Sequence, residues 1–137
     1  MKKVFLDTNI LIDILLDRDL KHISIEKIAP FLKDSKVFLS TLSVHITFYI
    51  LKIKASSMMH KKTLNLINTM NLIPLSNIIV GISLNTYLND FEDTLQYYSA
   101  LDQNCDYILT RDIKDFEKIK KTIPSNIQII DTLKGVL

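Results

Sequence analysis

Acidic residues at three separate places in this sequence have the type and the setting to do chemistry together. Asp7 follows a short apolar run, Asp112 follows another one far along the chain, and the segment DFED supplies Asp90, Glu92 and Asp93. Carboxylates that share a site repel one another, so their pKa values rise unless a cation lies between them. Mg²⁺ and Mn²⁺ prefer oxygen ligands and retain several waters. Acids that meet in this way predict a divalent-metal site that acts on a phosphodiester through an activated water.

The elements expected around these acids alternate along the chain. Runs of β-favouring residues predict strands at 3–6, 36–40, 72–75, 107–110 and 127–130. Apolar residues at helical spacing predict a first helix capped by Thr8 or Asn9, and further helices at 22–33, 41–55, 58–70, 77–88, 91–104 and 113–119. This alternation implies parallel strands in an α/β sandwich. Sites in open parallel sheets form at the carboxyl ends of the strands, so we expect Asp7 and Asp112 to meet there.

Each acid also has a plainer interpretation. An Asp after a strand is a good helix N-cap, and acids in a first helical turn interact favourably with the helix dipole. Taken alone, Asp7 would be interpreted as an N-cap and Asp93 as an acid of a first helical turn. The hypothesis of a metal site rests on the joint pattern.

Length and composition set limits on the class of protein. The 137 residues suit one domain spanning 1–137, without repeats or linkers. The apolar runs are all broken by polar residues, so we expect no membrane span. Acids also break the apolar N-terminus, which we interpret as mature structure and not as a signal peptide. The single cysteine, Cys105, agrees with a reducing compartment, and we expect a cytoplasmic protein.

Two classes of site are disfavoured by the residues that are rare. The two glycines, Gly81 and Gly135, permit neither of the glycine-rich phosphate loops, which disfavours nucleotide binding by those loops. The histidines His22, His45 and His60 are isolated, and no histidine–cysteine group has zinc spacing. We therefore interpret the histidines as surface or structural residues.

Charge is segregated along the chain. No Asp or Glu occurs between Ser35 and Asn89, whereas that stretch contains lysines, among them Lys52, Lys54, Lys61 and Lys62. A basic segment beside an acidic site is consistent with a nucleic-acid surface. The alternative is a solvated helix face with lysines on it.

Two blocks of the sequence resemble the signatures of a known family. VFLDTNILIDILL is similar to the opening of PIN-domain ribonucleases, and DFEDTLQYYSALDQNCDYILTRDIKDF resembles their second signature, with the VapC-like toxin group as the nearest branch. The resemblance implies a single-domain, three-layer α/β/α sandwich with a central parallel sheet in the order 3-2-1-4-5. It also implies endonucleolytic cleavage of RNA that depends on Mg²⁺ or Mn²⁺.

The resemblance also implies roles for individual residues. Matched position by position, the metal-binding and catalytic acids would be Asp7, Asp93 and Asp112. Thr8 and Asn9 would form the turn, with Asn9 bracing Asp7, and the hydroxyl of Thr110 would support the site. Asp90 and Asp115 are possible additional acids. RNA contacts would come from Lys52, Lys54, Lys61, Lys62 and Arg111, although Arg111, beside Asp112, could instead pair internally.

The chain departs from the family pattern at one acid. The family usually carries a Glu on the helix after the second strand, and the matching position here is Ile46, or Thr47 if the register slips by one. Loss of one anion would weaken metal binding. One alternative is therefore a weakened or inactive PIN-like domain that binds RNA or a protein partner. Another is a phosphatase or phosphoacceptor domain, which Asn9 disfavours because such enzymes commonly have a second Asp there.

Partners are implied only by the resemblance. VapC-like proteins form homodimers and bind an antitoxin protein. The pairs Phe48–Tyr49 and Met58–Met59 could supply an apolar surface for such a partner, or they could simply belong to the core.

Overall fold

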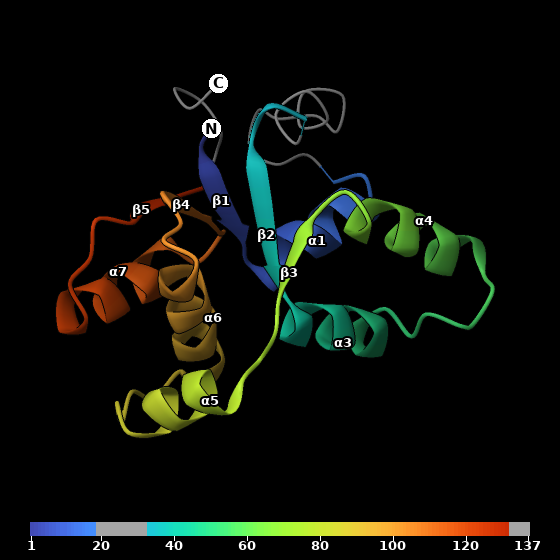
Figure 1. The fold of residues 1–137 in the computed structure, drawn as a ribbon. Helices are drawn as coiled ribbons and strands as arrows, with labels where there is room; N and C mark the ends of the chain where they lie inside the picture. Colours follow the sequence, from blue (N-terminus) through green and yellow to red (C-terminus); the bar gives the residue numbers. More distant parts are fainter. Residues whose placement is uncertain (19–32, 132–137) are drawn as a thin grey trace.

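The computed structural model describes residues 1–18 and 33–131, and five parallel strands lie at its centre (Figure 1). The strands are β1 (Lys3–Leu6), β2 (Lys36–Ser40), β3 (Asn71–Ile73), β4 (Tyr107–Leu109) and β5 (Gln128–Ile130). They pair in the order β3-β2-β1-β4-β5, with Phe5 opposite Phe38 on one side and Ile108 on the other. The sheet order implied by the family resemblance is confirmed.

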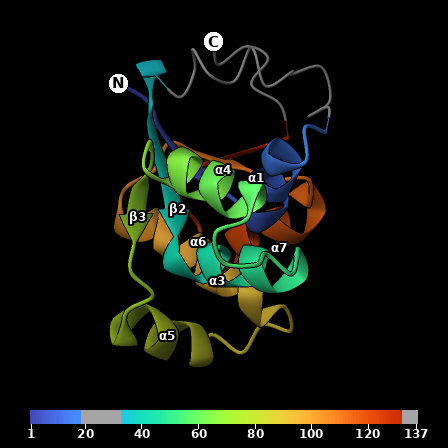
Figure 2. The ribbon, with the colours of Figure 1, turned by 90° about the vertical axis from the view of Figure 1, so that its right-hand side faces the viewer.

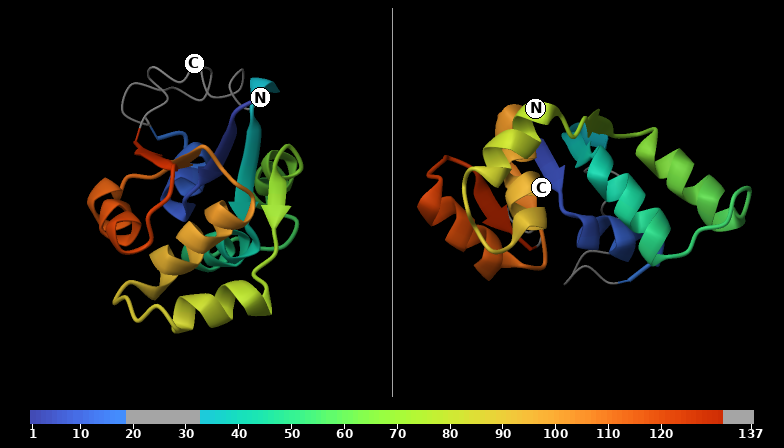
Figure 3. Two further views of the ribbon diagram at one scale, coloured as in Figure 1. Left: turned by 60° about the vertical axis from the view of Figure 1, so that its left-hand side comes forward. Right: turned by 90° about the horizontal axis from the view of Figure 1, so that it is seen from below.

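Helices cover both faces of the sheet. Helices α1 (Thr8–Leu15), α3 (Thr41–Ile50) and α4 (Met58–Ile67) lie on one side, and α5 (Asn77–Leu84), α6 (Phe91–Asp102) and α7 (Ile113–Thr122) lie on the other (Figures 1 and 2). The right-hand view of Figure 3, from below, also shows α1, α3 and α4 on one side of the sheet and α5, α6 and α7 on the other. Within the described part of the chain, none of the helices has the length and apolar character that crossing a bilayer requires. The three-layer α/β/α arrangement is confirmed.

The alternation of side chains along β1 explains why both faces are covered. Val4 and Leu6 pack into the apolar cluster beneath α1, whereas Phe5 packs into the cluster beneath α6 and α7. Neighbouring residues of a strand point to opposite faces, and an apolar residue at each position requires cover on both. Phe5 is completely buried, which contributes about 1.5–3 kcal/mol to stability relative to exposure.

Several predicted boundaries are wrong by a few residues. Helix α3 ends at Ile50 and not near Ala55, and Lys52 just beyond it has a φ of 49°. Helices α4, α5 and α6 also end earlier than predicted, α7 extends further, and β3 begins one residue earlier and ends before Pro74. The first cap is wrong as well, because Asp7 and not Thr8 or Asn9 is the N-cap of α1. The helix predicted at 22–33 lies largely outside the described residues.

Candidate metal centre

A pocket of ≈ 450 Å³ lies where β1 and β4 end, and it gathers the acids expected from distant parts of the chain. Asp7 follows β1, Asp112 follows β4, and the DFED acids begin α6. The carboxylates that line the pocket are those of Asp7, Asp90, Glu92, Asp93 and Asp112. The parallel sheet brings these residues together because both strands end on the same edge.

Asp7 is held in place by hydrogen bonds from both sides. Its Oδ1 accepts from the Thr8 backbone N–H at 2.8 Å, and its Oδ2 accepts from the Thr110 hydroxyl at 2.7 Å. The same Thr110 hydroxyl accepts from the backbone N–H of Asp112 at 2.9 Å, so one side chain connects both acids. Thr110 is completely buried between the two acids that it contacts.

Burial is the main influence on the ionisation of Asp7. Its side chain lies inside the protein, and its pKa is raised to about 6, chiefly by desolvation and to a smaller extent by the negative charges of Asp112 and Glu92. The hydrogen bonds from Thr110 and Thr8 lower the pKa but do not outweigh burial. A carboxylate with a raised pKa is stabilised by binding a proton or by a cation beside it.

Asn9 braces Asp112 and not Asp7, which corrects the role expected for it. Its amide Nδ2 donates to Asp112 Oδ2 at 3.1 Å, and its Oδ1 accepts from the Arg111 backbone N–H at 3.4 Å. Asn9 lies in the first turn of α1, so its side chain reaches across to the segment after β4. The amide therefore fixes the loop that carries Asp112.

Asp93 is the most perturbed acid of the group. Its pKa is raised to about 9, chiefly by desolvation and also by the hydrogen bond with Asp90 and the charges of Asp7, Asp90 and Asp112. Asp90 is the N-cap of α6 and accepts from the Asp93 backbone N–H at 3.1 Å. Burial and the charges of Asp90 and Asp112 also raise the pKa of Glu92. The pKa values of Glu92 and Asp93 are therefore raised by burial and by the acids beside them.

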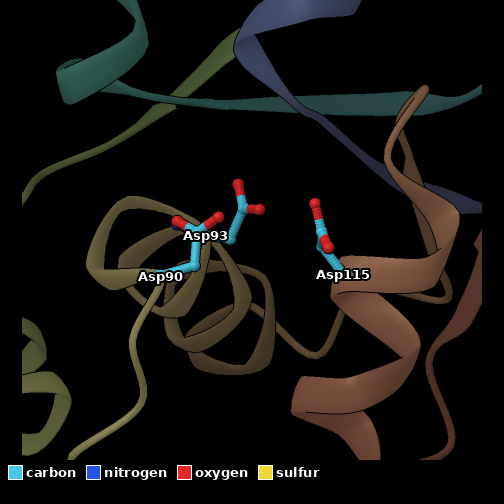
Figure 4. A group of neighbouring side chains, drawn as sticks. All are labelled: Asp90, Asp93 and Asp115. Carbon is cyan, nitrogen blue, oxygen red and sulfur yellow. The ribbon is translucent and has the colours of Figure 1, made fainter.

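Asp115 lies close to two of these acids. Single carboxylate oxygens of Asp90, Asp93 and Asp115 all lie within 4.8 Å of one another, and among the described residues this is the one acidic group with such spacing. Figure 4 shows Asp90 and Asp93 at the start of α6 and Asp115 at the start of α7, facing a common gap. Asp7 and Asp112 stand outside this tighter group, although they line the same pocket as Asp93.

The other wall of the pocket is aliphatic. It is formed by Ile12, Leu16, Ile46, Ile50 and Leu51. Ile46 lines the pocket, whereas Thr47 is fully buried and does not, which favours the first of the two registers expected for the missing acid. The position matched to the family's Glu therefore presents a hydrocarbon side chain to the carboxylates.

Arg111 pairs internally with a residue that the sequence interpretation did not single out. Its Nε lies 3.1 Å from Asp13 Oδ2, so the partner is Asp13 and not the adjacent Asp112. Arg18 lies 3.5 Å from the other oxygen of Asp13. A signal for Asp13 existed, since it is the one acid within the apolar run ILIDILL.

The lysines expected to contact RNA lie outside the pocket lining. Lys52, Lys54 and Lys61 are exposed, and Lys52 directly follows Leu51, which lines the pocket. Lys62 has internal partners, because its Nζ donates to the Leu15 carbonyl at 2.7 Å and to Asp17 at 3.2 Å. Lys62 is therefore less available to RNA than the other three.

A buried polar cluster underlies the site and was also missed. The Gln96 Nε2 donates to the hydroxyls of Thr8 and Ser43 at 3.0 and 2.8 Å, and these two hydroxyls lie 2.8 Å apart. Gln96 stands one turn after Asp93 on α6, and Ser43 stands one turn before Ile46 on α3. The cluster ties together α1, α3 and α6, each of which contributes residues to the pocket lining.

Comparison with known proteins agrees with this geometry. The profile of the PIN domain matches residues 3–114. A chain of the crystal structure of VapBC2 from Rickettsia felis bound to a DNA fragment from their promoter has a similar fold, with a TM-score of 0.61 and 17% identity over 93% of this chain and 96% of that one. A search of curated proteins gave no match. With most of its length matched by this profile and its acids gathered at the strand ends, the chain belongs to the PIN-domain family.

Proposed function

We propose that this protein is a metal-dependent endoribonuclease that cleaves RNA phosphodiesters, and that it is the toxin of a toxin–antitoxin pair. The observation that carries the proposal is the meeting of Asp7, Asp93 and Asp112 in one pocket from three distant parts of the chain. Asp7 and Asp93 are buried, and a buried carboxylate is seldom left without a paired group or a bound cation. A cytoplasmic location belongs to the same proposal.

The residues present fit a hard divalent cation such as Mg²⁺ or Mn²⁺. All the candidate donors are carboxylate oxygens, and burial raises the pKa of both Asp7 and Asp93, as expected of anions that lack a counter-charge. We assign the binding of the ion to Asp7, Asp93 and Asp112, with Asp90 and Asp115 near enough to Asp93 to add to it. When bound, the cation supplies positive charge at the phosphodiester and a lower pKa for the attacking water.

The protein's own groups hold this arrangement in place. Thr110 fixes the carboxylate of Asp7 and the backbone of Asp112 with one hydroxyl, and Asn9 fixes the carboxylate of Asp112. Carboxylates held in fixed positions favour an attack in which the water, the phosphorus and the leaving oxygen lie in line. In this step the water oxygen forms a bond to phosphorus while the bond from phosphorus to the 3′ oxygen breaks. The 3′ oxygen then takes up a proton, and the products carry a 5′-phosphate and a 3′-hydroxyl.

RNA cleavage with a matched control tests this proposal. A fluorescent single-stranded RNA is incubated with the protein in Mn²⁺, Mg²⁺ or EDTA, and products are separated on a denaturing gel. We expect cleavage only with metal, and a loss on the order of 100-fold or more in Asp93→Asn, because a ligand is removed. Asp102→Asn makes the same change at the exposed end of α6 and should cleave normally. Equal cleavage by both variants would remove the catalytic assignment.

A second candidate function is a PIN-like domain that binds RNA or a partner protein without cutting. The observation that favours it is Ile46, which lines the pocket where the family's Glu is expected. The same assay separates the two, because this candidate predicts RNA binding without metal-dependent products from the wild-type protein.

An antitoxin partner and a homodimer are also proposed. The R. felis structure that shares this fold is described as VapBC2 with DNA, and this chain exposes apolar side chains that a partner could cover. Tyr49 and Met58 are 77% and 88% exposed, so they do not belong to the core, whereas Met59 packs against it. Light scattering on the purified protein tests the dimer directly.

A further inference from the structure

The arginines of this chain converge on one buried carboxylate. The sequence has 15 lysines but only two arginines, Arg18 and Arg111. Arg111 comes from the segment after β4 and Arg18 lies three residues after the end of α1, yet both guanidinium groups approach Asp13. Arginine differs from lysine in its planar group with several donors, which suits simultaneous contact with a carboxylate and a phosphate.

Asp13 is placed to hold these cations and not to face solvent. Its residue exposure is 2%, and among the described residues its Oδ1 has no hydrogen-bond partner, although Arg18 lies 3.5 Å away. Its Oδ2 has the closer contact with Arg111, at 3.1 Å. A buried carboxylate needs compensation by positive charge, and within the described chain the two arginines supply it.

The outer sides of the arginines remain available. The side chains of Arg18 and Arg111 are 56% and 51% exposed, and both residues line the pocket that contains the carboxylates. They are the only cationic residues of that lining within the described chain. RNA that approaches the acids needs positive charge nearby, because its phosphates are repelled by them.

We propose that Arg18 and Arg111, oriented by Asp13, form a phosphate-binding subsite for an RNA phosphate next to the one that is cleaved. Asp13 is a positioning residue, since it touches the arginines and not the RNA. This subsite rests on the proposed RNA substrate but not on catalysis. The subsite adds Asp13 and Arg18 to the proposed RNA-binding residues. Arg111 then pairs with Asp13 and contacts an RNA phosphate at the same time.

RNA affinity without metal tests the subsite. Anisotropy of a fluorescent single-stranded RNA is measured in EDTA over a range of salt concentrations. For Arg18→Gln and Arg111→Gln we expect affinity to fall roughly five- to tenfold in each variant. The slope of log affinity against log salt should fall by about 0.7 for each phosphate that the variant no longer neutralises. Lys36→Gln makes the same charge change at the opposite end of the sheet and should change neither quantity by as much.

The lysine variants separate geometry from charge. Arg18→Lys and Arg111→Lys keep the positive charge but lose the planar group, and we expect them to bind RNA more weakly than the wild type. Affinity equal to the wild type would overturn the subsite, because a diffuse electrostatic attraction would then explain the binding. Both variants change half-exposed side chains, so they remain informative if a change at Asp13 prevents folding.

Asp13→Asn distinguishes positioning from neutralisation. If Asp13 only neutralises the arginines, its removal frees two cations and RNA binding becomes tighter. If it orients them, binding becomes weaker despite the more positive protein, and Asp13→Asn has no further effect in Arg18→Gln/Arg111→Gln. We expect the second result, with circular dichroism to verify that the variant is folded. Tighter binding would overturn the proposal.

The outcome also separates this subsite from the proposed nuclease. Wild-type protein that binds RNA through the arginines but does not cut it would leave the subsite intact and remove the nuclease. If the wild-type protein cuts RNA in a metal-dependent way but the arginine variants bind RNA as tightly as it does, the nuclease would stand and the subsite would be overturned. Wild-type protein that fails to bind single-stranded RNA would overturn the subsite.

Discussion

Among single residues, Thr110 and Asn9 hold the acids that the two strand ends bring together, because Thr110 contacts both Asp7 and Asp112 and Asn9 contacts Asp112. Asp7 and Asp112 could be placed because a parallel sheet puts its strand ends on one edge. The partners of Asn9 and Arg111 could not be placed, since Asn9 reaches Asp112 and Arg111 reaches Asp13 through the tertiary fold. Local spacing carries no information about which distant carboxylate a long side chain will meet.

Ile46→Glu should restore the missing acid. The side chain at this position lines the pocket beside the carboxylates, so a carboxylate there should increase Mn²⁺ affinity by on the order of tenfold. Isothermal titration with Mn²⁺ measures the change. His45→Glu adds the same group one residue earlier, at an exposed position outside the pocket lining, and serves as the control. Similar affinities for both variants would argue against the assignment of this position.

At the scale of elements, the buried polar cluster sets how α1, α3 and α6 meet. Thr8, Ser43 and Gln96 are at least 96% buried and contribute one residue from each helix. Buried polar groups that are mostly satisfied specify one arrangement of a core, because any shift leaves a donor without a partner. The acceptor Gln96 Oε1 has no hydrogen bond among the described residues, so the cluster is not fully satisfied.

Gln96→Ala should destabilise the protein and disturb the site. It removes two hydrogen bonds and leaves a cavity, so we expect a loss of about 2–4 kcal/mol in the free energy of unfolding. Urea denaturation followed by circular dichroism gives this value. Gln128→Ala changes an exposed residue of β5 and should stay within about 0.5 kcal/mol of the wild type. A loss no larger than that control would mean that the cluster does not fix the helices.

The element types were predictable while their ends were not. Apolar runs identified all five strands, because a strand covered on both faces is apolar at most positions. Apolar residues at helical spacing identified the described helices, because each helix buries one face. The end of α3 was missed since Leu51 and Ile53 continue an apolar pattern past the true end at Ile50. Lys52 departs from the helix with a positive φ that no residue type there signals. The sheet order came from the family resemblance and not from any pattern of residues.

At the scale of the whole molecule, the acidic pocket lowers the stability of the metal-free protein. The pKa values of Asp7 and Asp93 are raised in the folded state, to about 6 and about 9, chiefly by burial. Between the ordinary pKa of an Asp side chain, 3.8, and these raised values, the folded protein binds more protons than the unfolded chain. The free energy of unfolding therefore falls as pH rises through this interval. A bound cation reverses the effect, because it binds the folded carboxylates and not the unfolded chain.

Thermal unfolding across pH checks this expectation. In EDTA, the melting temperature should fall between pH 5.5 and pH 8. The folded protein keeps the proton of Asp7 up to about pH 6 and that of Asp93 up to about pH 9, whereas the unfolded chain has already lost both. Asp93→Asn should flatten the decline, whereas Asp102→Asn should retain it. Mn²⁺ should raise the melting temperature at pH 8, with a stabilisation of about 2.7 kcal/mol when the metal is at 100 times its dissociation constant. A wild-type melting temperature that rises with pH in EDTA would contradict the account of the pocket.

The most direct measurement is an anomalous difference map from crystals of the wild-type protein soaked in Mn²⁺. We expect a peak in the pocket within coordination distance of Asp93 and of at least one of Asp7 and Asp112, bordered by Ile46 on the aliphatic side. An empty pocket at saturating Mn²⁺, or a peak that none of these three carboxylates contacts, would contradict the central claim that they form a metal centre.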